Sequence, residues 1–271
     1  MKYTVLTLFP EITDAFFATS IMAKAIKRGI IEYKAVNIRD FALDKHKTCD
    51  DAPYGGGPGM LMLPEPLDLA LKSVLKKSSR RGAETQGTQG EEKGRREEVR
   101  GQRVIYLSPS GKPFSQEFAK ELAAEKELIL VCGRYEGIDQ RIIDRYVDDE
   151  ISIGDYVLSS GEVAALAIID ATYRLVDDVI RAESLSEESF SDGLLEYPQF
   201  TRPEEFDTMR VPEVLLSGHH EQIRLWRLEK RVEKTLKQRP DLIKRGRELG
   251  VFNSEINGII DKFLGEKDER N

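Results

Sequence analysis

Three glycine-rich segments hold the residues whose types and spacing could do chemistry. They read DDAPYGGGPGM at 50–60, VCGRYEGID at 131–139 and ISIGDYVLSSGE at 151–162, and each follows a strand-like run. Ligands of α/β folds bind beyond the carboxyl ends of strands, where glycine lets the backbone approach a ligand closely. None of the three has the spacing GxxxxGK[ST], and none is a GxGxxG after the first strand, which argues against a P-loop NTPase and a standard dinucleotide fold. The residues predict an α/β enzyme with a ligand pocket built from loops, and they do not identify the ligand.

Short apolar runs are predicted to be the buried strands that position these segments. The four runs are Tyr3–Phe9, Ile30–Ile38, Val104–Leu107 and Leu128–Cys132, with Val147–Ile153 as a weaker fifth. Helical patterns lie between them, at Ile12–Arg28, Pro66–Lys77, Ser115–Ala124, Asp139–Arg145 and Glu162–Val176. Alternating strands and helices predict an α/β domain with a mostly parallel sheet and right-handed crossovers.

The composition limits the class of protein. The apolar fraction is 40%, which supports a packed core, while the net charge of −7 argues mildly against a nucleic-acid binder. Cys49 and Cys132 have no CxxC partner, and adjacent His219 and His220 make a poor metal pair, so we expect reduced thiols and no metal site. No apolar stretch is long enough to span a membrane and no cleavage pattern follows the start, so we expect a soluble, cytoplasmic protein.

The chain is predicted to divide into a catalytic domain over 1–178, a flexible linker over 179–202 and a helical domain over 203–271. The linker is small, polar and acidic, and it is followed by helical patterns at Pro212–Leu216, His219–Gln238, a helix opened by Pro240, and Ser254–Leu264. Residues 78–101 are almost free of large apolar side chains, so we expect a flexible loop there, with a basic tether for RNA as the alternative.

A basic stretch lies in the helical domain. From Glu221 to Glu248 there are ten lysines and arginines and five acidic residues, a local charge of +5. One interpretation is a face that contacts phosphates. The other, which the sequence alone favours, is a solvated helix face with ion pairs four residues apart.

Seven motifs together resemble the bacterial tRNA (guanine-N1)-methyltransferases, whose catalytic domain is of the SPOUT type. They are LFPE at 8–11, YGGGPGM at 54–60, YLSP at 106–109, CGRYEGID at 132–139, SIGDYVLS at 152–159, GLLEYPQFTRP at 193–203 and PEVLLSGHHEQIRLWR at 212–227. The resemblance covers nearly the whole chain except 78–101 and the extreme C-terminus. It implies a deep trefoil knot in the catalytic domain, and S-adenosylmethionine as methyl donor. It also implies N1 of guanosine 37 in tRNA as acceptor, and a homodimer whose active sites each use both chains.

The resemblance assigns the donor site to three segments with many glycines. Glycine would let backbone groups reach the adenine and ribose, and Glu136 would be the partner of the positively charged donor, with a salt bridge to Arg134 as the alternative. The positions are Tyr106, Leu107, Pro109, Gly133, Tyr135, Glu136, Gly137, Ile153, Gly154, Asp155, Tyr156, Val157, Leu158 and Gly161.

Two catalytic residues follow from the same resemblance. Arg174 matches an arginine that contacts guanine O6, and a helix pair with Asp170 is the alternative. Glu188 stands where the family has aspartate as the general base, which lengthens the side chain by about one C–C bond. Asp192 is the competing base, and a linker turn is its alternative role. The first rival interpretation is another SPOUT-type methyltransferase with a different RNA target. The second is a non-catalytic RNA-binding or assembly protein, which the Asp-to-Glu change leaves open.

The resemblance further places tRNA contacts at Asp50, Tyr54, Gly55, Asp192 and Arg224. Asp50 would face a guanosine flipped out of its stack, because N1 is not accessible within a stacked base. An Asx-turn cap is the alternative role for Asp50. Trp226 would contact the anticodon stem-loop, and a place in the hydrophobic core is its alternative.

Overall fold

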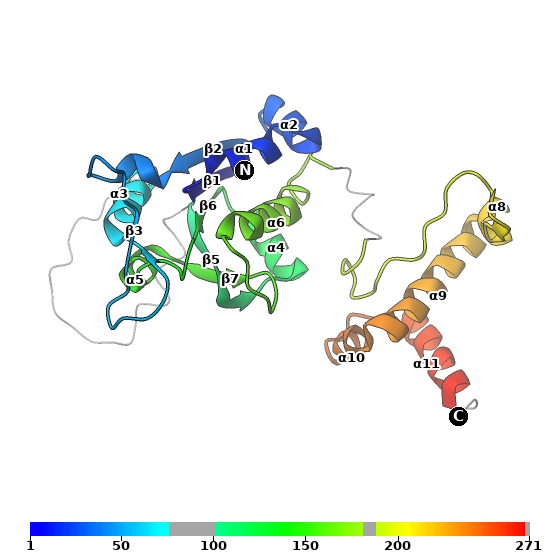
Figure 1. The fold of residues 1–271 in the computed structure, drawn as a ribbon. Helices are drawn as coiled ribbons and strands as arrows, with labels where there is room; N and C mark the ends of the chain where they lie inside the picture. The colour runs from blue at the N-terminus through cyan, green and yellow to red at the C-terminus, as the bar shows by residue number, and fades with distance from the viewer. Residues whose placement is uncertain (76–100, 181–187, 269–271) are drawn as a thin grey trace. The chain divides into compact units, whose positions relative to one another are not determined.

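The computed structural model of the chain describes residues 1–75, 101–180 and 188–268 (Figure 1). The chain divides into two compact units, 1–180 and 181–271, which are described separately below. The loop predicted at 78–101 lies outside the described residues, apart from Gly101.

A five-stranded parallel sheet forms the middle of the first unit. Its order is β2-β1-β6-β5-β7. The strands are β1 Lys2–Thr7, β2 Glu32–Asn37, β5 Arg103–Pro113, β6 Glu127–Cys132 and β7 Asp149–Ser152. Strand β6 is buried along its whole length, as an apolar run at the centre of a covered parallel sheet should be. The α/β class and the parallel sheet predicted from the apolar runs are therefore confirmed.

Helices cover both faces of this sheet. They are α1 Pro10–Phe17, α2 Ser20–Lys27, α3 Pro64–Val74, α4 Gln116–Ala123, α5 Gln140–Tyr146 and α6 Gly161–Tyr173, with a 3-10 turn η1 at Ile38–Phe41. The prediction of one helix over Ile12–Arg28 is wrong. The chain turns between α1 and α2, where Ser20 has a left-handed φ of +53° that a continuous helix does not allow.

The side chains of the strands alternate between two hydrophobic clusters. Leu128 and Leu130 of β6 belong to the cluster that also contains residues of α1, α2, α4 and α6. Ile129 and Val131 belong to the cluster that contains residues of α3 and α5. This period of two is the pleat of a strand with both faces buried.

A short antiparallel pair lies at the ends of the first glycine-rich segment. Strand β3 at Asp50–Asp51 pairs with β4 at Leu61–Met62, so that Asp50 faces Met62 in register. Strands of two residues are too short to give a periodic pattern, and the sequence analysis did not predict them.

The second unit packs helices around a core of its own. They are α8 Glu213–Leu216, α9 His220–Gln238, α10 Pro240–Glu248 and α11 Ser254–Asp268, and a short hairpin joins β8 Glu205–Phe206 to β9 Met209–Arg210. Leu228 and Val232 of α9 meet Ile243, Phe252 and Ile260 in the core, which also contains Leu194 from the segment before the helices. Part of the predicted linker is thus packed against α9.

Glu127, at the start of β6, is a buried carboxylate of the first unit. Glu127 is only 2% exposed, and it accepts hydrogen bonds from Lys2 at 2.7 Å, Gln102 at 2.8 Å and Thr4 at 3.1 Å. Burial by itself would raise the pKa of Glu127, but these hydrogen bonds outweigh it and the pKa is lowered.

We expect Glu127→Gln to destabilise the first unit at neutral pH, by about 2 kcal/mol, because the amide cannot accept all of these hydrogen bonds. A lowered pKa means that the charged carboxylate contributes stability above its ordinary pKa of 4.5 and loses it as the pH falls through the folded-state pKa. The difference in unfolding free energy between the variant and the wild type should therefore shrink below about pH 4. Scanning calorimetry at pH 7 and pH 3.5 measures it, and a difference independent of pH would contradict the assignment.

Candidate active site

A cavity of about 370 Å³ lies at the carboxyl ends of the neighbouring strands β6, β5 and β7. Three segments enclose it, with Ala164 of α6 completing the wall: 106–110, 133–137 and 151–161 except for Asp155. The first of these leaves the ladder between β5 and β7, where the register shifts between Leu107 and Lys112. The bulge opens room beside the sheet, as β-bulges next to functional sites do.

The second and third segments are held together by their backbones. The Gly161 amide donates to the Gly133 carbonyl at 2.9 Å, and Arg134 and Ser160 form an isolated antiparallel bridge. A Cβ atom at Gly161 would lie 2.8 Å from Cα of Cys132 and 2.9 Å from the Gly133 nitrogen. Only glycine allows the start of α6 to approach β6 this closely.

Tyr106 packs beneath the second segment. Its side chain is 6% exposed and its hydroxyl has a hydrogen bond with the backbone of Ile138. Burial raises the pKa of Tyr106 above its ordinary value, so the phenol stays protonated at neutral pH. Its hydroxyl would lie only 3.0 Å from a Cβ atom at Gly133 and 3.1 Å from one at Gly137. The ring therefore supports a stretch of bare backbone that faces the cavity.

The first glycine-rich segment reaches the cavity through Glu136. The Glu136 amide donates to the carbonyl of Met60 at 3.0 Å, and the Met62 amide donates to the carbonyl of Gly137 at 3.0 Å. A Cβ atom at Gly59 would lie 2.5 Å from Oε1 of Glu136. Strands β3 and β4, and Asp50 with them, are thereby attached to the wall of the cavity.

The tip of that segment stands away from the wall. Tyr54 is fully exposed, and Gly55 follows it with a left-handed φ of +88°. Asp50 is half-buried at the base of the segment. The guanidinium of Arg134 lies 4.8 Å from the centre of the Phe9 ring, and no ion pair joins it to Glu136 in the described ranges.

Thirteen of the fourteen residues predicted for the donor line this cavity; Asp155 is exposed and does not. Four apolar side chains that line the cavity are exposed: Tyr135, Tyr156, Val157 and Leu158. The sequence analysis missed Ser108, Ser110, Arg134, Ile151, Ser152, Ser159, Ser160 and Ala164. Their position beside the matched residues was the available signal. Which of these residues bind the donor stays a prediction.

Arg174 does not line the cavity of its own chain. It is the half-buried C-cap of α6, whereas Gly161, at the other end of this 13-residue helix, lines the cavity. At 1.5 Å per residue the helix separates the two by roughly 20 Å.

The other predicted residues belong to the second unit, where two of them are in ion pairs. Both carboxylate oxygens of Asp192 accept hydrogen bonds from Arg231. Arg224 donates to Glu221 at 2.8 Å and to Glu255 at 2.6 Å, and these hydrogen bonds raise its pKa. Glu188 is half-buried at the first described position of the unit.

The basic stretch around α9 is extensively paired with acids. Its exposed ion pairs are Lys230–Glu233, Arg239–Asp241, Lys244–Glu248 and Arg247–Asp261. These contacts favour the interpretation as a solvated helix face for much of the stretch. Trp226 is half-buried, with its ring centre 6.3 Å from that of Phe200.

Comparison with known proteins gives a family for this arrangement. Residues 1–245 match the family described as tRNA (Guanine-1)-methyltransferase TrmD. The chain belongs to this family. A tRNA (guanine-N(1)-)-methyltransferase of Treponema denticola is 61% identical over 266 residues, which are 98% of this chain and 100% of the relative. The proteins of the same name from Treponema pallidum and Borreliella burgdorferi are each 54% identical, covering 96% and 89% of this chain and 95% and 92% of the relatives.

The tRNA (guanine-1)-methyltransferase match includes both units, because it extends past α9 into α10. Within the described residues, no three His, Cys, Asp or Glu side chains gather as a metal site would require. No helix in the described part of the chain has the length and hydropathy to cross a membrane.

We expect Gly161→Ala to destabilise the first unit by about 2 kcal/mol, because the added methyl group meets backbone atoms that cannot move aside. Gly258→Ala is the matched control: a Cβ atom there meets nothing within 4 Å, and alanine favours the helix. Scanning calorimetry measures both. Trp226 is the single tryptophan and lies in the second unit, so its fluorescence reports the unfolding of that unit alone. This unfolding should be the same in Gly161→Ala and in the wild type. Equal stability of Gly161→Ala and wild type would refute the close approach.

Proposed function

We propose that this chain transfers the methyl group of S-adenosylmethionine to N1 of guanosine 37 in tRNA, in the cytoplasm. The family supports the guanine N1 acceptor. The observation that carries the donor is the cavity, whose wall is bare backbone from glycines beside exposed apolar side chains and one carboxylate. Such a wall suits a ligand with a flat heterocycle, a ribose and a positive charge.

The donor needs few polar side chains in this site. Backbone amides and carbonyls of 133–137 and 151–161 would hydrogen-bond the adenine and ribose, while Tyr156 and Leu158 supply apolar contact. Glu136 would face the positive charge of the donor. Glu136 lines the cavity and has no ion pair to Arg134 within the described residues.

The reaction is a displacement at the methyl carbon. The bond from guanine N1 to the methyl carbon forms as the carbon–sulfur bond breaks, and the sulfur leaves with the electron pair as a neutral thioether. Glu188 accepts the N1 proton, and Arg174 stabilises the negative charge that develops on O6. Positioning supplies much of the rate, because the sulfonium is already an activated leaving group.

The active site of this proposal needs two chains. Arg174 lies ten residues beyond Ala164, the last residue of α6 that lines the cavity of its own chain, which is roughly 15 Å along the helix. A homodimer brings Arg174 of one chain to the cavity of the other. The family resemblance supports this arrangement, together with a deep trefoil knot around the cavity segments.

The helical unit is proposed to bind the anticodon stem-loop. Guanosine 37 would leave its stack to expose N1, with Asp50, Tyr54 and Gly55 beside the flipped base. Lys234 and Lys237 of α9 have no ion pair within the described part of the chain, which leaves them for phosphates, whereas Arg224 would have to exchange its two glutamates.

We expect Glu188→Gln to slow methyl transfer by 100-fold or more, of the order that a general base contributes. The measurement is the single-turnover rate on a tRNA transcript, with the product nucleoside identified by mass spectrometry. Glu229→Gln, which removes an exposed ion pair of α9 to Lys262, is the matched control and should retain the wild-type rate. Methyl found on ribose or another base would overturn the assigned reaction, and an undiminished rate in Glu188→Gln would remove this residue from it.

Two inactive variants should restore activity when mixed. Gly154→Trp fills the cavity and should abolish donor binding by calorimetry, and Arg174→Ala should bind donor but transfer slowly. If each site takes its cavity from one chain and Arg174 from the other, a heterodimer of the two variants has one intact site out of two. Random mixing makes about half of the dimers heterodimers, so about a quarter of the wild-type number of sites should be active. Activity that stays at the level of the separate variants would show that the two residues act within one chain.

A further inference from the structure

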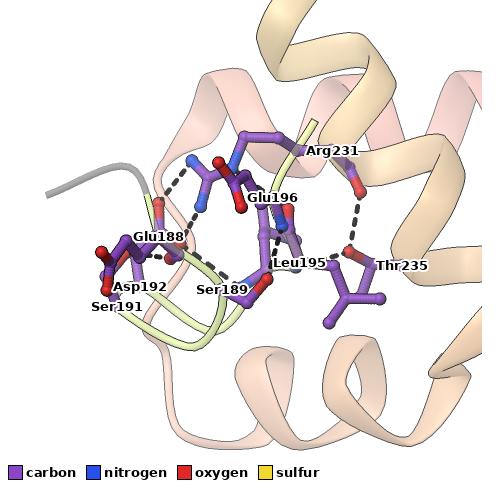
Figure 2. A network of polar contacts seen from close by, with 9 residues as sticks. Glu188, Ser189, Ser191, Asp192, Leu195, Glu196, Arg231 and Thr235 are labelled. Atoms are coloured by element: carbon purple, nitrogen blue, oxygen red, sulfur yellow. Dashed lines mark hydrogen bonds and ion pairs between the residues drawn. The ribbon is translucent and has the colours of Figure 1, made fainter. Parts of the chain in front are cut away.

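The segment that carries Glu188 is folded against α9. Figure 2 shows side chains of this segment between Glu188 and Glu196, with Arg231 and Thr235 on α9 beside them. We call residues 188–196 the base loop. The composition of residues 179–202 predicts a flexible linker, and the base loop departs from that prediction.

Arg231 is the main link between α9 and the base loop. Its side chain is 9% exposed, and its two terminal nitrogens bond both oxygens of Asp192. Its Nε donates to the carbonyl of Leu195 at 3.3 Å. One guanidinium therefore fixes the loop at two positions, three residues apart, which a lysine could not do.

Thr235, one turn further along α9, adds a third link. Its buried hydroxyl accepts from the Leu195 amide at 2.9 Å and donates to the Arg231 carbonyl at 2.7 Å. Next to Leu195, the fully buried Leu194 enters the hydrophobic core of the unit. The C-terminal half of the base loop is thus fixed by both polar and apolar contacts.

The N-terminal half is tied to the fixed half. The Phe190 amide donates to the Leu194 carbonyl at 2.9 Å, and the Glu196 amide donates to Ser189 Oγ at 3.0 Å. The Glu188 carbonyl accepts from the Ser191 hydroxyl at 2.7 Å. The hydroxyl of Ser191 thus holds the Glu188 carbonyl, and the next residue, Asp192, is held by Arg231.

We propose that Arg231 is a positioning residue for methyl transfer: it presets the base loop so that the helical unit delivers Glu188 to the guanine in a formed conformation. Asp192 is its anchor and not the base, because both of its oxygens are held by the guanidinium. This inference rests on the proposed role of Glu188. Its consequence is that loss of Arg231 lowers the rate of transfer and leaves tRNA affinity nearly unchanged.

A double-mutant cycle tests the proposal in the full chain. Arg231→Gln, Glu188→Gln and their combination are compared by single-turnover rate at saturating tRNA transcript and S-adenosylmethionine. We expect Arg231→Gln to be about 100-fold slower, since a misplacement near 1 Å has that effect. In the Glu188→Gln background the same change should cause no further loss, because the loop then has no base to position. The dissociation constant for tRNA should stay within about twofold of wild type.

Two further variants separate positioning from folding. Arg231→Lys can still meet Asp192 but not also Leu195, so it should recover part of the rate with the fold kept, as judged by Trp226 fluorescence during unfolding. Glu233→Gln removes an exposed ion pair on the same helix and should behave as wild type. If Arg231→Gln fails to fold, Arg231→Lys decides: a wild-type rate in it would overturn the proposal.

The remaining outcomes distinguish this inference from the proposed function. If Glu188→Gln is slow but Arg231→Gln is as fast as wild type, only the positioning role is wrong. If the two losses multiply in the double variant, Arg231 acts by another route and the inference is overturned. If Glu188→Gln keeps the wild-type rate, Glu188 is not the base, and both the base assignment and the inference that rests on it fail.

Discussion

The close approach of two backbones, at Gly161 and at the Cys132–Gly133 link, is the constraint on which the candidate site depends. The amide of Gly161 bonds the carbonyl of Gly133 at 2.9 Å, and no side chain fits between the start of α6 and the end of β6. This contact joins two of the three segments that enclose the cavity. It also fixes where α6 starts, and hence where Arg174, at its far end, stands. The same backbone contact therefore fixes the position of the cavity wall at one end of α6 and that of Arg174 at the other.

In the second unit, polar contacts hold a loop in one conformation. In the first unit, backbone fixes a cavity wall; in the second, a buried arginine fixes a loop. An arginine buried against a carboxylate is a modest source of net stability, because desolvation offsets much of the attraction. Its better use is to select one conformation out of many, which is what the base loop requires.

Much of this fold was predictable from the sequence, since β1, β6 and the first part of β5 are buried apolar runs with helical patterns between them. Strands β2 and β7 carry charged residues, and their apolar signal is weaker. The break between α1 and α2 was not predictable, because Ser20 adopts a left-handed conformation that no hydrophobic pattern encodes. Thirteen of the residues that line the cavity were predicted by resemblance, and the residues taken alone predict only a pocket built from loops. The pairing of Asp192 with Arg231 joins positions 39 residues apart, and it needed coordinates because charged residues crowd this part of the chain. The placement of Arg174 away from its own cavity needed the length and direction of α6.

The packing of Gly59 on the carboxylate of Glu136 has a thermodynamic consequence. Glycine at position 59 leaves room for the Glu136 side chain, and backbone hydrogen bonds of Glu136 and Gly137 to Met60 and Met62 join the two segments. A ligand that displaced the backbone at Glu136 would therefore also act on the strand pair that holds Asp50. Thermodynamic linkage makes such a coupling reciprocal. If a ligand in the cavity changed the binding free energy of a second ligand beside Asp50, the second ligand would change the binding free energy of the first by the same amount. For two such ligands, the factor by which one changed the affinity of the other would be the same in both directions.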